Sequence, residues 1–268
     1  MNDAGIETQH RIIPGCEWLA KITEAERIRR ANEHFGEMPL EEFERMYFGI
    51  EVGNIRRYFE QRMMRWIPKD CGAFIDYGCG GTWWKQYWQI PKQVIGIEID
   101  ESNLLRLRKA FPDRLRYRLI HAPTGLTTLP DASADVILSS GVLGFILPSQ
   151  AELHVAEIAR MLKPGGRAVF SRVNAMNYGT IRRLSKLTES AKGGFAYQYT
   201  RRELRSLMEK AGFQVAAAER LGFYLPFQTR SQQWAYRSKT VQELDRIFHR
   251  LVPGFAVHHL MVAQKPQN

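Results

Sequence analysis

The chain has 268 residues, enough for one large domain with a sizeable core, and its 44% hydrophobic and 25% charged residues are typical of a globular protein. Its formal net charge of +10 fits an anionic partner: nucleic acid, a membrane face or a phosphorylated substrate. Three cysteines without a CxxC pair favour a reducing cytoplasm, and no apolar run approaches the roughly 18 residues of a membrane span. The first residues lack the basic and apolar regions of a signal peptide.

The basic residues are scattered along the chain in small groups. These groups are Arg27 with Arg29-Arg30, Arg56-Arg57, Arg182-Arg183 and Arg201-Arg202. No long basic tract and no nucleic-acid-binding motif accompanies them. We therefore expect most of them on solvated helix faces.

Residues 1–69 are predicted to form a helical extension or lid. Residues 1–15 look irregular, residues 17–34 carry apolar positions at the spacing of an amphipathic helix, and residues 40–66 form a second helical stretch rich in aromatics. These aromatics either pack the helices onto the core or face a substrate. In the second case Tyr47 is a candidate substrate contact.

From residue 73 onward, strand patterns alternate with helix patterns, which indicates a parallel sheet with helices on both faces. Strands are expected at 73–77, 94–98, 115–121, 134–139, 167–172, 213–218 and 255–263. Helices are expected at 82–89, 102–111, 149–162 and 201–210. The predicted fold class is α/β: a doubly wound, seven-stranded, mostly parallel sheet over residues 70–268, with its last strand antiparallel. An insertion at about 175–199 carries a basic helix near 180–187.

The first strand leads into an acid and a glycine cluster, Asp76-Tyr77-Gly78-Cys79-Gly80. Glycines let a backbone approach a ligand closely, so this order predicts a site for a nucleotide-like cofactor. A dinucleotide fingerprint that starts at Gly78 requires glycine at position 83, where this chain has Trp83. Trp83 therefore disfavours an NAD site. A P-loop is excluded because no Gly-Lys-Ser/Thr follows the glycine cluster.

Further motifs follow the glycine cluster in order. An acid ends the second strand in Gly96-Ile97-Glu98, Leu129-Pro130 precedes the fourth strand, and Leu162-Lys163-Pro164-Gly165-Gly166 precedes the fifth. The ordered set resembles the class I S-adenosylmethionine (SAM)-dependent methyltransferases over roughly residues 70–265. The resemblance implies an enzyme of that fold with SAM as its cofactor.

Two acids are the main candidates for holding this cofactor. A carboxylate at the end of the second strand can accept hydrogen bonds from both ribose hydroxyls, which favours Glu98 over a helix cap or a surface acid. The resemblance implies that Asp76 lies by the cationic amino group of the methionine part, directly or through water. The alternative for Asp76 is a carboxylate that braces the loop.

Other candidates surround these acids. The resemblance suggests that Ile99 packs on the adenine face. Many members carry an acid after the third strand, but this chain has His121-Ala122-Pro123-Thr124 there, so the backbone is expected to supply the adenine contact. The remaining predicted cofactor contacts lie in the glycine cluster and at strand ends: Tyr77, Gly78, Cys79, Gly80, Ala122 and Ser139.

Methyl transfer from a sulfonium mainly requires alignment, and a base is needed only where the acceptor must lose a proton. No catalytic base can be named from the sequence. His121 fits an ordinary loop histidine and His154 a structural one, while His258 and His259 must point to opposite sides of the last strand. No metal-ligand spacing is recognised.

The methyl acceptor is open. Aromatics of the 223–236 region, with Trp234 as a candidate substrate contact, suit an enclosed apolar pocket or simple packing of a loop. The leading hypothesis is an O or N acceptor on a small molecule, of natural-product, quinone-like or lipid-linked type. The second is an RNA or protein methyltransferase that uses the basic surface, and the third is a non-catalytic SAM-binding module.

Overall fold

The computed structural model describes residues 6–8, 53–80, 93–110, 112, 117–146, 148–173, 187–189, 195–197, 199–223, 235–252 and 256–267. The predicted helices at 17–34 and 82–89, most of the helical stretch at 40–66 before residue 53, and nearly all of the basic helix at 180–187 lie outside these residues. Within them, no helix combines the length and apolarity that a membrane span requires.

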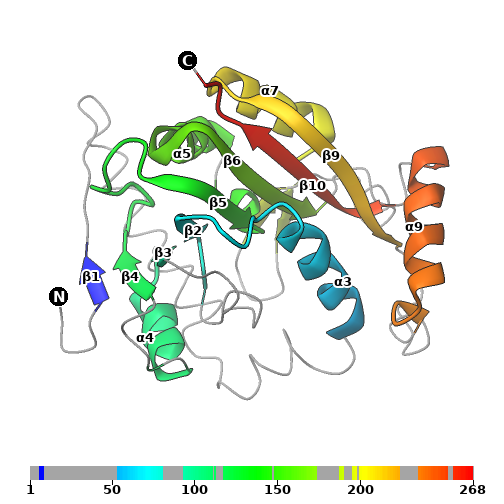
Figure 1. Cartoon of the computed structure of the whole chain (residues 1–268), viewed down its shortest axis with the longest axis horizontal. Helices are drawn as coiled ribbons and strands as arrows, with labels where there is room; N and C mark the ends of the chain where they lie inside the picture. Colours follow the sequence, from blue (N-terminus) through cyan, green and yellow to red (C-terminus); the bar gives the residue numbers. More distant parts are fainter. Residues whose placement is uncertain are drawn as a thin grey trace.

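The described chain is built around an eight-stranded sheet with the order β1-β4-β3-β2-β5-β6-β10-β9 (Figure 1). The strands are β1 Ile6–Thr8, β2 Ala73–Tyr77, β3 Gln93–Glu98, β4 Tyr117–His121, β5 Ala134–Ser140, β6 Leu162–Val173, β9 Gln214–Phe223 and β10 Ala256–Gln264. β10 pairs antiparallel with β6 and β9, and every other pair in this sheet is parallel. The predicted mostly parallel sheet with an antiparallel last strand is confirmed.

The strand count of seven was one too few. Ile6–Thr8 was expected to be irregular, but it pairs in parallel with β4, Ile6 is buried, and Arg118 Nε donates to Glu7 Oε2 at 2.7 Å. A three-residue strand is too short to show an alternating pattern, and only its distant partner reveals it.

Two further boundaries differ from expectation. β6 already begins at Leu162, so the predicted turn at Pro164-Gly165-Gly166 lies within the strand, next to a register shift in its pairing with β5. The insertion contains an antiparallel pair, β7 Leu187–Glu189 and β8 Phe195–Tyr197, where a helix and a loop were expected.

Helices cover both faces of the large sheet, as predicted for a doubly wound fold (Figure 1). They are α3 Gly53–Met64, α4 Glu101–Ala110, the 3-10 helix η3 Val142–Phe145, α5 Pro148–Met161, α7 Arg201–Lys210 and α9 Lys239–Leu251. One core lies between the sheet and α5 and α7, and a second lies on the α3 and α4 side. α7 begins with a capping box, since Thr200 Oγ1 accepts from Glu203 N and Glu203 Oε2 accepts from Thr200 N.

Candidate functional site

The glycine cluster forms a tight loop at the carboxyl end of β2. Gly78 N and Cys79 N both donate to Ile97 O, at 2.8 and 3.0 Å, which folds the loop over the end of β3. Gly78 has a φ of 76°, and a Cβ there would lie 2.3 Å from Val142 Cγ2 in η3, so this position requires glycine. Gly80 has a φ of 63°, and no heavy atom of the described residues lies within 4 Å of the place a Cβ would take, which leaves room for a ligand beside its backbone.

Glu98, the last residue of β3, is tied to this loop. Its Oε2 accepts from Gly80 N at 2.8 Å, and its Oε1 accepts from Ile99 N at 2.8 Å and Asp100 N at 3.2 Å. Burial raises the pKa of Glu98, and these three amide donors oppose that rise. A carboxylate offers about four acceptor positions, so Oε2 keeps one for a hydroxyl of a ligand.

The loops after β3 and β4 brace one another beside Glu98. Ala122 N donates to Glu98 O at 2.8 Å, and Ala122 is fully buried. The ring nitrogen Nε2 of His121 lies 3.1 Å from Ile99 O; since a carbonyl only accepts, Nε2 carries the proton. His121 thus holds the half-buried Ile99 loop in place.

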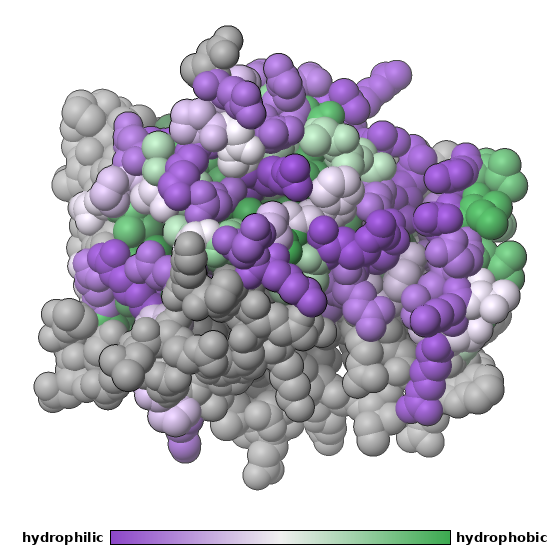
Figure 2. All heavy atoms as spheres, in the orientation of Figure 1, coloured by the Kyte–Doolittle hydropathy of each residue, from purple (hydrophilic) through white to green (hydrophobic). Residues whose placement is uncertain are grey.

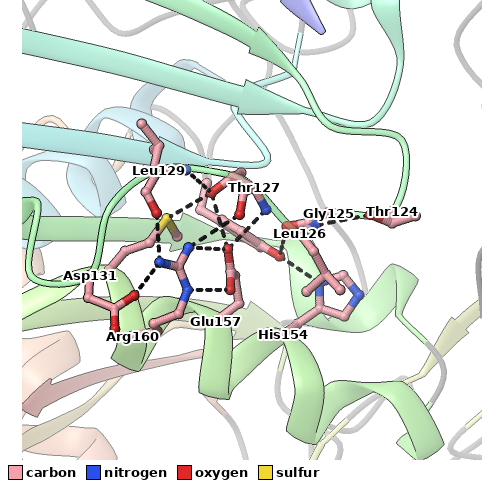
Figure 3. Close-up of polar contacts among 11 residues, drawn as sticks. Thr124, Gly125, Leu126, Thr127, Leu129, Asp131, His154, Glu157 and Arg160 are labelled. Atoms are coloured by element: carbon pink, nitrogen blue, oxygen red, sulfur yellow. Dashed lines mark hydrogen bonds and ion pairs between the residues drawn. The ribbon is translucent and has the colours of Figure 1, made fainter. Parts of the chain in front are cut away.

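A second set of bonds anchors the loop after β4 to α5 (Figure 3). Tyr77 OH donates to Gly125 O at 2.7 Å, so it accepts from His154 Nδ1 at 2.6 Å. His154 is only 2% exposed, which confirms the structural role expected for it. Tyr77, predicted as a cofactor contact, therefore points its hydroxyl at the scaffold beneath the loop.

The same loop is held further along by a buried ion pair (Figure 3). Arg160 donates from Nε to Glu157 Oε2 at 2.9 Å and from Nη2 to Glu157 Oε1 at 2.8 Å, while Thr127 N also donates to Glu157 Oε1 at 2.9 Å. Arg160 Nη1 reaches Leu129 O at 2.6 Å and Asp131 Oδ1 at 2.7 Å. The two partners of the bidentate pair both come from α5, so this helix positions the entire stretch before β5.

Two more predicted residues occupy the carboxyl ends of β2 and β5. Asp76 is 6% exposed and pairs in register with Leu138, one residue before Ser139. Ser139 is 3% exposed, and its Oγ has no hydrogen-bond partner. A buried hydroxyl without a partner is unusual, and here it lies at the edge of the sheet where the glycine loop lies.

Cys79 packs inward. Burial, together with the charges of Asp76 and Glu98, raises the pKa of its thiol well above the ordinary value, so the side chain acts as a small neutral group in the core. Only its backbone remains for the predicted role in the loop.

The two predicted substrate contacts, Tyr47 and Trp234, lie outside the described residues. Tyr236, an aromatic of the same predicted pocket region, is buried and donates to Asp245 Oδ1 at 2.6 Å, so it belongs to the scaffold.

The sequence interpretation missed two residues beside the site. Asp100 caps α4 through Ser102 N at 2.9 Å, and Val142 closes on Gly78. An Asp two residues before Ser102 at a helix start was a readable capping signal, whereas the approach of η3 to the glycine loop was not.

Comparison with known proteins agrees with this geometry. Residues 75–170 match a family described as a methyltransferase domain, and no curated protein matches the chain in sequence. Residues 75–170 therefore carry a methyltransferase domain, and SAM is the cofactor of this enzyme.

Solved structures share the fold. An S-adenosylmethionine-dependent methyltransferase from Mesorhizobium loti is 21% identical over 81% of this chain and 100% of its own, with a TM-score of 0.58. The 1,6-didemethyltoxoflavin-N1-methyltransferase of Burkholderia thailandensis is 14% identical over 96% of this chain and 92% of its own, with a TM-score of 0.56. The cyclase SpnF is 17% identical over 78% of this chain and 80% of its own, also with a TM-score of 0.56. At these identities the likeness extends to the fold alone.

Proposed function

We propose that this enzyme transfers the methyl group of SAM to an oxygen or nitrogen of a small molecule of natural-product, quinone-like or lipid-linked type. The observation that carries this proposal is the likeness to 1,6-didemethyltoxoflavin-N1-methyltransferase, which spans 96% of this chain and 92% of that one. The shared length therefore includes segments outside the methyltransferase domain match, where acceptor contacts are expected. A division into a lid at 1–69 and a catalytic domain at 70–268 is part of the proposal.

The cofactor side of the proposal assigns roles to the loop and strand ends. Glu98 accepts a ribose hydroxyl at the free position of Oε2, and the longer bond from Asp100 N at 3.2 Å is the one that a second hydroxyl displaces most easily. Asp76 faces the amino group of the methionine part, and Gly80 lets the backbone approach it. Ile99 and the backbone at Ala122 flank the adenine.

SAM supplies an electrophilic methyl group on a sulfonium, and the protein residues orient its two ends. Asp76 would hold the methionine part and Glu98 the ribose, on the two sides of the sulfonium, which fixes the direction of the methyl group. Ser139 Oγ, buried without a partner, is a donor available at the same edge of the sheet. His121 Nε2 donates to Ile99 O, so Nδ1 is the nitrogen of this ring that could accept a proton.

The test of the cofactor site is Glu98→Gln. The variant keeps the shape and relieves a buried charge, so the fold should persist, while the bonds from the ribose hydroxyls weaken. A hydrogen bond to a charged group contributes about 1.5–3 kcal/mol, which predicts SAM binding roughly 10- to 100-fold weaker by calorimetry. Glu152→Gln, on the exposed side of α5, is the control and should bind SAM normally. Unchanged SAM affinity in Glu98→Gln would overturn this assignment.

The acceptor is tested by following labelled methyl groups from SAM into a panel of small amines, phenols and quinols. Transfer to one of these supports the proposal. Transfer only to RNA or protein would favour the second hypothesis, for which the net charge of +10 is the argument and a steep salt dependence the signature. Figure 2 shows hydrophilic residues interspersed with apolar ones on the visible described face.

A third candidate is a protein that binds SAM without transferring its methyl group. The likeness to SpnF supports this third candidate, because SpnF has the same fold and is described as a cyclase. Tight SAM binding with no transfer to any member of either panel would support this candidate and overturn the first.

The proposed location is the cytoplasm. Its support is that Cys71 and Cys79 are both buried free thiols, and burial raises the pKa of Cys71 to about 11.

A further inference from the structure

His259 on β10 is a buried histidine whose ring lacks hydrogen bonds. The residue is 3% exposed, and neither Nδ1 nor Nε2 has a hydrogen-bond partner in the part of the chain that the structure describes. Buried polar groups nearly always have hydrogen-bond partners. An imidazole with both nitrogens unsatisfied therefore indicates that a ligand group binds beside it. The neighbours of His259 show what kind of group that is.

Arg220 lies directly opposite His259, since the two residues are partners in the antiparallel pairing of β9 with β10. Side chains of such partners lie on the same face of the sheet, with Cβ atoms about 5 Å apart. Arg220 is half-buried, and in the described part of the chain it forms no ion pair. Burial lowers its pKa, and the charge of Arg201 lowers it further.

Arg201 is the third member of the cluster and the first residue of α7. Burial lowers the pKa of His259 to about 4, and the charges of Arg220 and Arg201 act in the same direction. No described carboxylate contributes to the shift at either His259 or Arg220. Arg201, at the positive end of a ten-residue helix, therefore lies close enough to Arg220 and His259 to act on both electrostatically; Glu203 in the first turn of this helix is already engaged in the capping box.

The cluster lies toward the carboxyl edge of the sheet, on the face that carries Ser139. Ser139, Phe170 and Met261 are successive partners across β5, β6 and β10, and His259 follows two residues from Met261 toward the carboxyl edge. Ser139 and His259 thus share one face of the sheet. Two strand spacings of about 4.8 Å separate their strands, a lateral distance of roughly 10 Å. That is the length of a small molecule with its reacting atom near the cofactor and a tail at His259.

We propose that His259, Arg220 and Arg201 form a subsite for an oxyanion, a carboxylate or phosphate carried by the methyl acceptor. The inference rests on the proposed function, because the oxyanion belongs to that acceptor. The arginines supply charge and forked donors, and the neutral imidazole donates one N–H. The imidazole nitrogen that donates this N–H and the uncompensated charges of the arginines then have one common explanation.

The test uses the full chain and two probes, inorganic phosphate and acetate. We expect one of them to bind saturably, to shift the imidazole NMR signals of His259 and to raise Tm with concentration. Binding of phosphate but not acetate assigns a phosphate, and the reverse assigns a carboxylate. Arg220→Gln should weaken this binding at least tenfold, Arg220→Lys less, and Arg205→Gln on the exposed side of α7 should leave it unchanged.

SAM affinity is measured on the same samples. Normal SAM binding without saturable binding of either probe would overturn the subsite and leave the proposed function intact. If Arg205→Gln weakened probe binding as much as Arg220→Gln, the subsite would likewise be overturned, because the loss would then come from the lower net charge of the protein. Loss of SAM binding in the wild-type chain would instead overturn the proposed function, whatever the probes do.

Discussion

Neighbouring residues on the two faces of the paired strands β9 and β10 have opposite surroundings. Glu219 and His258 point to the α3 and α9 side, where the chain itself supplies partners. Arg220 and His259, one position further along each strand, point to the α7 side and have no acceptor among the described residues. The first face is built for stability, and the second leaves the buried nitrogens of His259 available to a ligand.

The α3 and α9 side is centred on Asp245, a buried residue of α9. Its Oδ1 accepts from Tyr236 OH at 2.6 Å and pairs with His249 Nε2 at 3.0 Å. Its Oδ2 accepts from Gly222 N at 3.2 Å and Tyr58 OH at 3.3 Å. One carboxylate thus joins α3, α9 and β9, and burial together with its charge raises the pKa of Tyr58.

Other polar residues of this face also contact α3, although the Nδ1 atoms of His249 and His258 have no hydrogen-bond partner among the described residues. Glu219 Oε2 accepts from Arg62 Nε at 2.8 Å, and Trp66 Nε1 lies 3.3 Å from Glu219 Oε1. His258 packs edge-on against Phe59, with ring centroids 4.6 Å apart. α3 therefore packs on β9 and β10 through both polar and aromatic contacts. Polar residues on this face hold helices, and polar residues on the other face do not.

The largest expected effect concerns the satisfied face. Asp245→Ala leaves four donors without their acceptor, and removal of one partner from a buried charged network costs about 3–5 kcal/mol. We expect urea unfolding to show a loss of free energy of unfolding of that size, with Tm lower by several degrees. A loss below about 1 kcal/mol would show that this face does not differ from the other.

The second effect concerns His259 and acid. Its pKa is about 4 in the folded chain against 6.5 ordinarily, so the unfolded chain takes up the proton first. The contribution of neutral His259 to the free energy of unfolding is fully present above about pH 6.5 and decreases as the pH drops. The loss reaches about 3 kcal/mol once the pH is below the pKa values of both the unfolded and the folded chain. Urea unfolding from pH 7 to 4 should show this loss in the wild type and not in His259→Gln.

The difference between these two chains is the informative quantity. The raised pKa of Glu98 acts in the opposite direction, because the folded chain gains stability as the pH falls through that pKa. This gain is common to both chains and cancels. Parallel pH profiles for wild type and His259→Gln would contradict the buried, unpartnered state of His259.

The smallest effect compares two adjacent residues. Glu219→Gln weakens an ion pair whose side chains are 19% and 14% exposed, and we expect a loss of about 1–2 kcal/mol. Arg220→Gln removes a charge that burial disfavours, so stability should change by no more than about 0.5 kcal/mol or rise. Unfolding of the two variants side by side measures the contrast. A larger loss for Arg220→Gln would reveal a structural partner and argue against a ligand.

Much of the fold and half of the site could be predicted from the sequence. The buried strand before Asp76, the glycine loop and the acid at Glu98 are local signals, and so is the capping box of Thr200, since each depends on residues a few positions apart. Strand alternation alone correctly placed His258 and His259 on opposite sides. The three-residue β1 and the early start of β6 were missed because pairing with distant strands decides them.

The sequence by itself determined the alternating strands and helices from β2 to β6, the glycine loop after β2 and the acid Glu98 at the end of β3. These follow from backbone geometry and period, which short stretches encode. Only the tertiary structure decided which polar residues are satisfied: Tyr58 meets Asp245 across 187 positions, whereas His259 meets Arg220 and no acceptor. The physical reason is that a hydrogen bond between side chains depends on which faces pack together, and a periodic pattern gives the face without its partner.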